Sequence, residues 1–305
     1  MMNRILVTMI VLATFGCEGM NRAESVRKMN EGLDAYKRGL NVDAIDMLKE
    51  ASRVDPTYAD PSYFLAQIYH VKLKELDNAE RFYREAQDRD KDNPQIAYRL
   101  GSVMAERGKW SEAESMQNEA TRLDDKFAKA WFRKGLAQEH QEKYVDAVAS
   151  YSKSIHANAR MKMEKSDPGG AAYHALGKLY VRYKQFDKAL AVYENGLLNN
   201  DQATSPNRPV QLFSGKGVAL MELGKYQDAG ASFEKALSID GGHTTSIFNL
   251  AVANMAMKKT DAAIKGFERF KSRADRSEDE ARIVAAQGFI QQIRTAEEKA
   301  KEKTK

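Results

Sequence analysis

The side chains that could bind a metal ion or act as nucleophiles are few and widely separated in this chain. Cys17 is the single cysteine, and no two histidines have the H-E-x-x-H spacing that places two zinc ligands on one helix. The sequence also has no glycine-rich phosphate loop and no G-x-S-x-G elbow. We therefore expect no catalytic residue, no metal site, no cofactor and no small-molecule substrate. The histidines are His70, His140, His156, His174 and His243.

A repeated spacing is far more informative. Seven times, a small residue is followed by alanine twelve or thirteen positions later, and the first members lie 34, 35, 34, 42, 40 and 34 residues apart. A period in this range indicates stacked units, none of which can bury its own apolar face alone. The pairs are Gly32/Ala44, Ala66/Ala79, Gly101/Ala113, Gly135/Ala147, Gly177/Ala189, Gly217/Ala229 and Ala251/Ala263.

Each unit is predicted to be two helices joined by a tight turn, because apolar residues recur at helical spacing on both sides of a short polar segment. Glycine inside a helix costs about 0.5–1 kcal/mol relative to alanine. Its recurrence at one phase indicates a close helix crossing, with Gly177 and Ala189 as the contact pair of the fifth unit. Gly39, Gly108 and Gly224 are expected to end first helices in the left-handed conformation.

These positions resemble the tetratricopeptide repeat, a 34-residue helix–turn–helix. The match is residue by residue for Trp131 with Gly135, and for Tyr173, Leu176, Gly177 and Tyr180. The resemblance implies an all-α fold, a right-handed superhelical solenoid of about seven such units plus a C-terminal capping helix. The expected units are 25–58, 59–93, 94–127, 128–161, 170–203, 210–243 and 244–277.

The amino-terminal segment differs from the rest. Arg4 precedes an uncharged, mostly apolar run of eleven residues, which predicts a signal peptide over residues 1–16. Cys17 resembles the lipidated cysteine of a bacterial lipoprotein, with residues 17–24 as a short tether. Plain secretion after cleavage at Gly16, or an uncleaved anchor, are the alternatives. Glu18 favours an outer-membrane lipoprotein facing the periplasm over retention at the inner membrane.

Three further segments lie outside the regular period. Residues 162–169 and 204–209 lengthen two joints between units, where an insertion could form a binding edge or a passive loop. Residues 278–305 are predicted to form a capping helix with a polar tail. Ser277 and Glu280 have the spacing of a capping box at its start.

The resemblance also implies a concave surface lined by the first helices. Residues three before, one after and four after each small residue are expected to point into it and to bind a partner segment. The alternative is that these aromatic residues only pack the core. The candidate binding residues are Tyr36, Tyr63, Gln67, His70, Tyr98, Phe132, Glu139, His174, Lys178 and Phe248.

Composition limits the function further. The 305 residues carry a formal net charge of +5 as mixed signs, without a basic stripe, so nucleic acid is not an expected partner. We expect a non-enzymatic protein-binding scaffold, tethered to a membrane by its lipid, that aids assembly or piloting of an outer-membrane complex. Pilotin and barrel-assembly lipoproteins share this architecture. An adaptor for peptidoglycan enzymes or proteases, or a self-associating structural envelope protein, are the alternatives.

Overall fold

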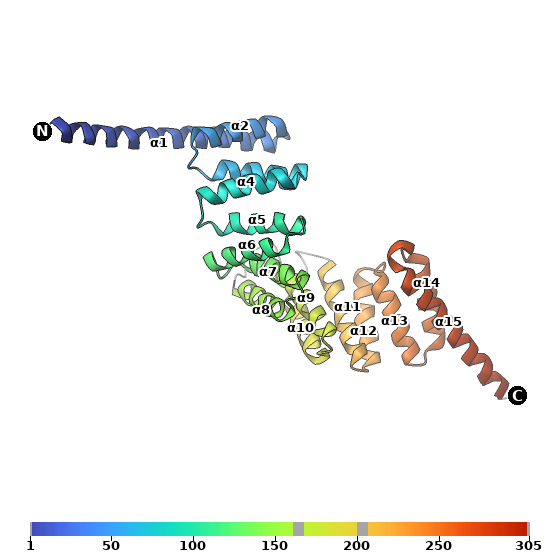
Figure 1. The fold of residues 1–305 in the computed structure, drawn as a ribbon. Helices are drawn as coiled ribbons and strands as arrows, with labels where there is room; N and C mark the ends of the chain where they lie inside the picture. The colour runs from blue at the N-terminus through green and yellow to red at the C-terminus, as the bar shows by residue number, and fades with distance from the viewer. Residues whose placement is uncertain (1, 161–167, 200–206, 304–305) are drawn as a thin grey trace. The chain divides into compact units, whose positions relative to one another are not determined.

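The computed structural model describes residues 2–160, 168–199 and 207–303, and all regular structure in them is helical (Figure 1). The chain divides into two compact units, Met1–Ala147 (unit 1) and Val148–Lys305 (unit 2), with the division inside α8. The elements are α1 (Met2–Lys37), α2 (Asn41–Val54), α3 (Asp60–Gln67), η1 (Ile68–Leu73), α4 (Leu76–Arg89), α5 (Pro94–Glu106), α6 (Trp110–Leu123), α7 (Ala128–His140), α8 (Tyr144–Arg160), α9 (Pro168–Arg182), α10 (Phe186–Leu198), α11 (Asn207–Glu222), α12 (Tyr226–Ile239), α13 (Thr244–Ala256), α14 (Thr260–Arg273) and α15 (Arg276–Lys303).

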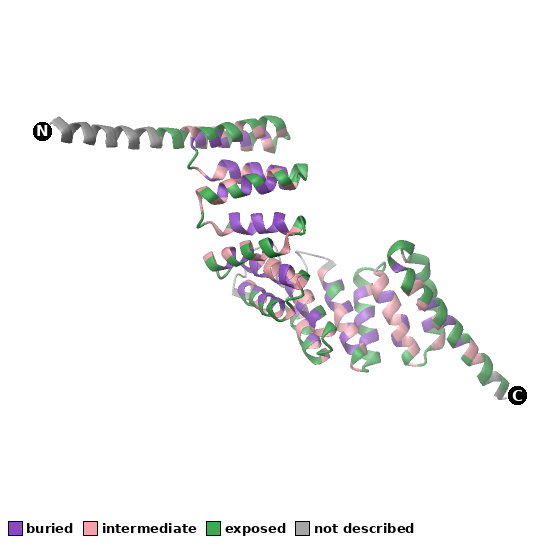
Figure 2. Cartoon of the chain, in the orientation of Figure 1, coloured by how far each residue is buried: buried purple, intermediate pink, exposed green. Residues whose placement is uncertain are grey.

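Consecutive helices pack as antiparallel pairs within each unit. The pairs α1 with α2, α3 with α4 and α5 with α6 form successive repeats in unit 1, and α9 with α10, α11 with α12 and α13 with α14 do so in unit 2. The expected all-α architecture of two-helix repeats is therefore confirmed. Figure 2 shows that the buried residues follow the facing sides of these helices, while the outward sides are exposed.

The repeated alanines lie where the sequence places them. All seven are at most 1% exposed: Ala44, Ala79, Ala113, Ala147, Ala189, Ala229 and Ala263. Each belongs to a second helix, whose side chains at this crossing must be small for the axes to approach.

The expected role of the paired glycines needs a correction. A Cβ added at Gly177 would lie 2.5 Å from the Tyr193 ring, and one at Gly217 would lie 2.5 Å from the Phe233 ring. Both rings belong to the residue four positions after the repeated alanine. The side chain nearest to Gly177 is therefore that of Tyr193, whereas at Gly32 and Gly101 an added Cβ would lie 3.2 Å from the carbonyl oxygen of the paired alanine, Ala44 or Ala113. In the seventh repeat Gly266 supplies the space instead, because its added Cβ would lie 2.8 Å from the Cβ of Ala251.

The turns within the repeats share one backbone feature. Gly39, Gly108 and Gly224 have positive φ, as expected, and so do Lys74, Glu142, Lys184 and Lys258. In six repeats this residue lies seven positions after the small residue; Lys74 lies eight positions after Ala66. The left-handed turn is thus required by the fold, and four repeats accept its strain in a non-glycine residue.

The second repeat absorbs one extra residue without changing the stack. Its small residue and alanine are thirteen positions apart instead of twelve. Here α3 continues as the π-helix η1, and the Lys74 N–H donates to the Tyr69 carbonyl, five residues back. A π-helical turn contains one more residue than an α-helical turn, so the extra residue is taken up before α4 begins.

Unit 2 ends in an aromatic core covered by α15. Phe267 and Phe270 are fully buried, and Phe248 and Phe289 pack against them, with Ile290 and Ile293 of α15. The predicted capping helix is present, but Ser277 does not cap it. Asp275 does, because its Oδ1 accepts hydrogen bonds from the Ser277 N–H and hydroxyl, and α15 begins at Arg276.

The amino-terminal helix is continuous. α1 includes the expected tether, residues 17–24, although the side chain of Cys17 is outside those described. Within the described residues, no helix has an apolar stretch long enough to cross a membrane. The longer joints fall largely on residues 161–167 and 200–206, which lie outside the described residues.

Candidate functional site

The candidate residues lie on first helices, but they differ in accessibility. We call the surface formed by α1, α3 with η1, α5 and α7 the first-helix face of unit 1. His70 and Tyr98 are only 6% and 9% exposed, whereas Lys178 in unit 2 is exposed. The other candidates are partly exposed: Tyr36, Tyr63, Gln67, Phe132, Glu139, His174 and Phe248.

Two of the candidates serve the core. The rings of Tyr98 and Phe127 have centroids 4.9 Å apart, and both side chains are buried. Phe248 lies 5.1 Å from Phe270 and 5.7 Å from Phe267. The packing alternative therefore accounts for Tyr98 and for most of the surface of Phe248.

The structure brings Tyr63 and His70 together with a residue that the sequence analysis did not select. Tyr83 of α4 lies beneath them, with its ring centroid 5.8 Å from Tyr63 and 6.2 Å from His70. His70 Nε2 lies 3.0 Å from Glu106 Oε1 of α5. The polar contact between His70 and Glu106 thus joins the second and third repeats on the first-helix face.

Three buried polar atoms, one each on α4, η1 and α5, have no hydrogen-bond partner. They are the Tyr83 hydroxyl, His70 Nδ1 and Arg99 Nε. Burial raises the pKa of Tyr83; the Arg99 guanidinium opposes this rise, and Tyr63 and Glu106 add to it. Arg99 and Glu106 therefore act on the Tyr83 hydroxyl from α5. We call Tyr63, His70, Tyr83, Arg99 and Glu106 the polar cluster.

The sequence contained one signal for this cluster. Arg99 lies two positions before Gly101, directly after Tyr98, which the sequence analysis selected. Tyr83 occupies a core position, four after Ala79, where the other repeats carry leucine, tyrosine or phenylalanine, except for Gln117 in the third. Because leucine and phenylalanine fill this position in other repeats, a hydroxyl is not required there.

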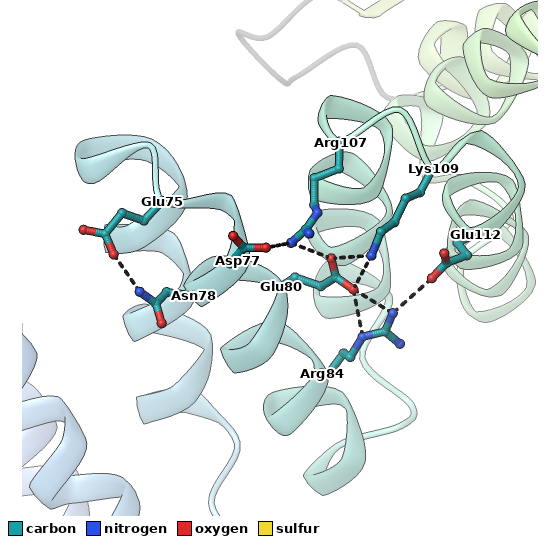
Figure 3. A network of polar contacts seen from close by, with 8 residues as sticks. All are labelled: Glu75, Asp77, Asn78, Glu80, Arg84, Arg107, Lys109 and Glu112. Carbon is teal, nitrogen blue, oxygen red and sulfur yellow. Dashed lines mark hydrogen bonds and ion pairs between the residues drawn. The ribbon is translucent and has the colours of Figure 1, made fainter.

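Buried carboxylates fix the orientation of these repeats. Glu80, directly after Ala79, accepts hydrogen bonds from Arg84 and from Lys109 of the next repeat, and Arg107 lies 3.1 Å away (Figure 3). Burial alone raises the pKa of Glu80, but the hydrogen bonds from Arg84 and Lys109 outweigh it and hold the pKa below its usual value. The neighbouring Glu75–Asn78 contact in Figure 3 is separate and local.

A glutamate makes the same kind of contact one repeat later. Glu114, directly after Ala113, accepts from Lys143 at 2.7 Å and from Gln138 and Gln141 at 2.9 Å. Burial is again the largest single influence and raises the pKa of Glu114, but the three donors together outweigh it and hold the pKa below its usual value. The carboxylates thus tie each repeat to the turn of the next, which keeps α3, α5 and α7 in register.

Two of the other histidines contact neighbouring side chains. His140 stacks on Trp110, with ring centroids 3.7 Å apart, and His243 Nδ1 lies 2.8 Å from the Ser246 hydroxyl. In the part of the chain that the structure describes, no group of three His, Cys, Asp or Glu residues could hold a metal ion.

Comparison with known proteins supports the fold. Tetratricopeptide repeat models match residues 29–94, 98–161, 174–244 and 245–277. No curated protein matches the chain. Among solved structures, yeast Tom70 aligns with a TM-score of 0.53 at 16% identity, over 92% of this chain but only 56% of Tom70.

Two further solved structures match over nearly their whole length. YrrB, described as a TPR protein with an unusual peptide-binding site, has a TM-score of 0.52 and 18% identity, and the match covers 68% of this chain and 97% of YrrB. PilF of Pseudomonas aeruginosa has a TM-score of 0.57 and 18% identity, over 74% and 96%. At such identities the likeness concerns the fold. With its crossing alanines, left-handed turns and matched repeats, the chain belongs to the tetratricopeptide repeat family.

Proposed function

We propose that this protein is a non-enzymatic scaffold that binds a segment of a partner protein on the first-helix face of unit 1. The observation that carries the proposal is the polar cluster, where partly exposed Tyr63 adjoins buried polar atoms that lack partners. Buried polar groups are normally hydrogen-bonded, so an unpaired set beside an accessible aromatic ring indicates a place for a ligand. The fold shared with YrrB, described as peptide-binding, is consistent with this use.

The binding surface is held rigid before a partner arrives. His70 with Glu106, Glu80 with Lys109 and Glu114 with Lys143 link successive repeats by polar contacts. A surface ordered in advance loses little conformational freedom on binding, so more of the contact energy is retained as affinity.

We further propose that the scaffold is tethered to the bacterial envelope through lipidated Cys17 and aids assembly or piloting of an outer-membrane complex. The support is the apolar run before Cys17 and the early start of the packed chain. Arg22 already pairs with Asp55, and the Ser25 hydroxyl donates to the Ala51 carbonyl. Five helical residues from Cys17 to Arg22 span about 8 Å, so the repeats would lie close to the membrane.

Two experiments test these proposals. A photo-crosslinking residue at Gln67 or Phe132, both partly exposed on first helices, should capture the same protein in cells. The same residue at exposed Asp146 of α8 is the control and should not capture it. An outer-membrane protein is the expected product. A peptidoglycan hydrolase or protease would favour the adaptor function, and a second copy of this chain would favour self-association.

The second experiment concerns the tether. Cys17→Ser should move the protein from the membrane fraction to the soluble fraction, because the thiol is the acylation site. If the variant stays with membranes at the wild-type level, the lipoprotein proposal is refuted while the protein-binding proposal is unaffected.

A further inference from the structure

An open pocket of about 340 Å³ lies between the second helices of the first two repeats, α2 and α4. We call it the α2–α4 pocket. Three cations line it, Lys49 and Arg53 from α2 and Arg89 from α4. Among the described residues that line the pocket, Glu85 is the one acid. The lining therefore has an excess of positive charge.

The glutamate is neutralised by contacts within the molecule. Glu85 Oε1 accepts hydrogen bonds from Arg89 and from the hydroxyls of Ser52 and Ser62. Arg89 also donates to the Ser52 hydroxyl at 2.7 Å and to the Tyr58 carbonyl at 3.1 Å. These bonds hold the guanidinium in one orientation and cancel its charge against Glu85. The two cations of α2 therefore supply the excess charge.

These two cations lack acidic partners. Lys49 and Arg53 are exposed, lie four positions apart on one face of α2, and form no ion pair among the described residues. Of the acids near them on α2, Glu50 is bonded to Lys28 at 2.8 Å and Asp46 pairs with neither. Like charges at this spacing repel each other, so an anion between them would stabilise the helix.

The lining favours a phosphate over a carboxylate. Its cations come from two helices, and a phosphate offers acceptor oxygens in more directions than the two oxygens of a carboxylate. Arginine pairs with phosphate through two parallel hydrogen bonds. Leu65 and Phe82 also line the pocket and are buried in the core of unit 1. A ligand with a phosphate joined to a short apolar part matches both kinds of lining.

The pocket lies at the end of unit 1 that is nearest to Cys17 along α1. Arg22 of α1 pairs with Asp55, which directly precedes the lining residue Pro56. Five helical residues from Cys17 to Arg22 span about 8 Å. The headgroup layer on each side of a bilayer is about 5–8 Å thick. A lipid on Cys17 would therefore bring the pocket close to the phospholipid headgroups.

We propose that the α2–α4 pocket binds the phosphate of an anionic phospholipid headgroup, with Lys49, Arg53 and Arg89 as the donors. This inference rests on the proposed membrane tether and gives the scaffold a second contact with the bilayer. Arg89 donates from N–H groups that its internal bonds leave free, since a guanidinium has five. Two contacts, the lipid and the pocket, fix the orientation of unit 1 on the membrane, which a single tether does not.

Short-chain phosphatidylglycerol, kept below its micellar concentration, is the probe for the full chain without its lipid. Short-chain phosphatidylcholine, whose headgroup has no net charge, is the comparison. The apolar run before Cys17 takes up both lipids alike, so a difference between them reports the headgroup. Because both tryptophans lie in unit 1, phosphatidylglycerol should raise the melting temperature of the tryptophan signal more than phosphatidylcholine does. Equal effects of the two lipids would overturn the proposal.

Charge-matched variants locate the site. Lys49→Gln/Arg53→Gln should weaken the binding of phosphatidylglycerol about 25-fold, since each basic residue at an anionic membrane surface contributes about fivefold. Lys37→Gln/Lys72→Gln removes the same charge from exposed lysines of α1 and η1, and it should bind as the wild type does. Equal losses in the two variants would show diffuse attraction and contradict a pocket. Without lipid, Lys49→Gln/Arg53→Gln should melt no lower than the wild type, because it removes a repulsion.

Inorganic phosphate separates the two sources of the ligand. It should bind more weakly than phosphatidylglycerol, because it lacks the apolar part that Leu65 and Phe82 contact. Equal affinity would make the pocket a site for free phosphate and overturn the lipid assignment. None of these measurements uses the lipid on Cys17, so their failure leaves the tether proposal standing. Failure of the Cys17→Ser experiment likewise leaves the pocket to be judged by these titrations.

Discussion

The two units join their repeats with different chemistry at the same position. In unit 1 the residue after the crossing alanine is Ile45 in the first repeat but a glutamate in the next two, the buried Glu80 and the half-buried Glu114, each tied to a lysine of the next turn. In unit 2 the same position holds Leu190, Gly230 and Ile264. Leu190 packs against the cores of both the fifth and sixth repeats. The same position can thus link repeats through a salt bridge, as at Glu80, or through apolar burial, as at Leu190.

The difference predicts how each unit responds to perturbation. Apolar contacts are non-directional and insensitive to pH, whereas a buried carboxylate requires its partners and its charge. Because both tryptophans, Trp110 and Trp131, lie in unit 1, their fluorescence follows the unfolding of unit 1, while far-UV circular dichroism follows both units. The following predictions use these two signals.

The largest effect is expected in unit 2. Phe233→Ala removes a fully buried ring that lies against Gly217, and it should lower the free energy of unfolding by about 3–5 kcal/mol. Urea titration should show the dichroism transition broadened or split, with the tryptophan transition unmoved. An equal shift of both signals would contradict the separation of the units.

A smaller loss is expected from the charged joint of unit 1. Glu80→Gln keeps the size of the side chain but removes its charge, and it should cost about 1–2 kcal/mol. The tryptophan transition should move to lower urea. The same change at Glu234, an exposed residue of α12, is the control and should move neither signal.

Acid should separate the units further. The pKa values of Glu80 and Glu114 lie below their usual range, so their contribution is complete above about pH 4.3 and is lost as pH falls through the lowered values. In unit 2, burial lowers the pKa of His243, so protonation begins to oppose folding below about pH 6.5.

These windows can be measured by urea midpoints at successive pH values. In the wild type, the urea midpoint of the tryptophan signal should fall below about pH 4.3. In a Glu80→Gln/Glu114→Gln double variant this fall should be smaller. His243→Asn should flatten the dichroism midpoint between about pH 6.5 and 5. If the double variant shows the same fall of the midpoint in acid as the wild type, the two carboxylates do not cause the acid sensitivity of unit 1.

The smallest effect concerns the turns. Lys184→Gly and Lys258→Gly in unit 2 should each raise the free energy of unfolding by up to about 1 kcal/mol, because φ is positive at both residues. Gly224→Ala, at the equivalent turn, should lower it by a similar amount. Thermal melting of the three variants gives the comparison, and a stabilising Gly224→Ala would contradict the role assigned to these turns.

The sequence predicted the repeat architecture because steric requirements at a crossing leave few allowed residues. The seven alanines are buried as expected, and the residue four positions later is a buried aromatic side chain in five repeats and Leu48 in the first. The sequence did not reveal that Tyr193 has the side chain nearest to Gly177, because spacing along one chain does not show which side chain of the facing helix reaches a glycine. The cap of α15 was wrong for a related reason, since both Asp275 and Ser277 are good capping residues.

The candidate site was less predictable. The phases selected on the first helices located Tyr63 and His70, but Tyr98 and Phe248 are mainly packed in the core. The polar cluster also depends on Tyr83 of a second helix and on Arg99 at an unselected phase. Such a site is formed by three helices together, so no single periodicity contains it.

The π-helix η1 has a consequence for how such a surface could change. One residue added to a helical turn advances the side chains after it by about 100° around the axis. Here the shift ends at Lys74, and Ala79 and every later crossing alanine keep their places. The gain or loss of a single codon in one first helix can therefore change which of its side chains face the binding surface, while the neighbouring repeats continue to stack as before.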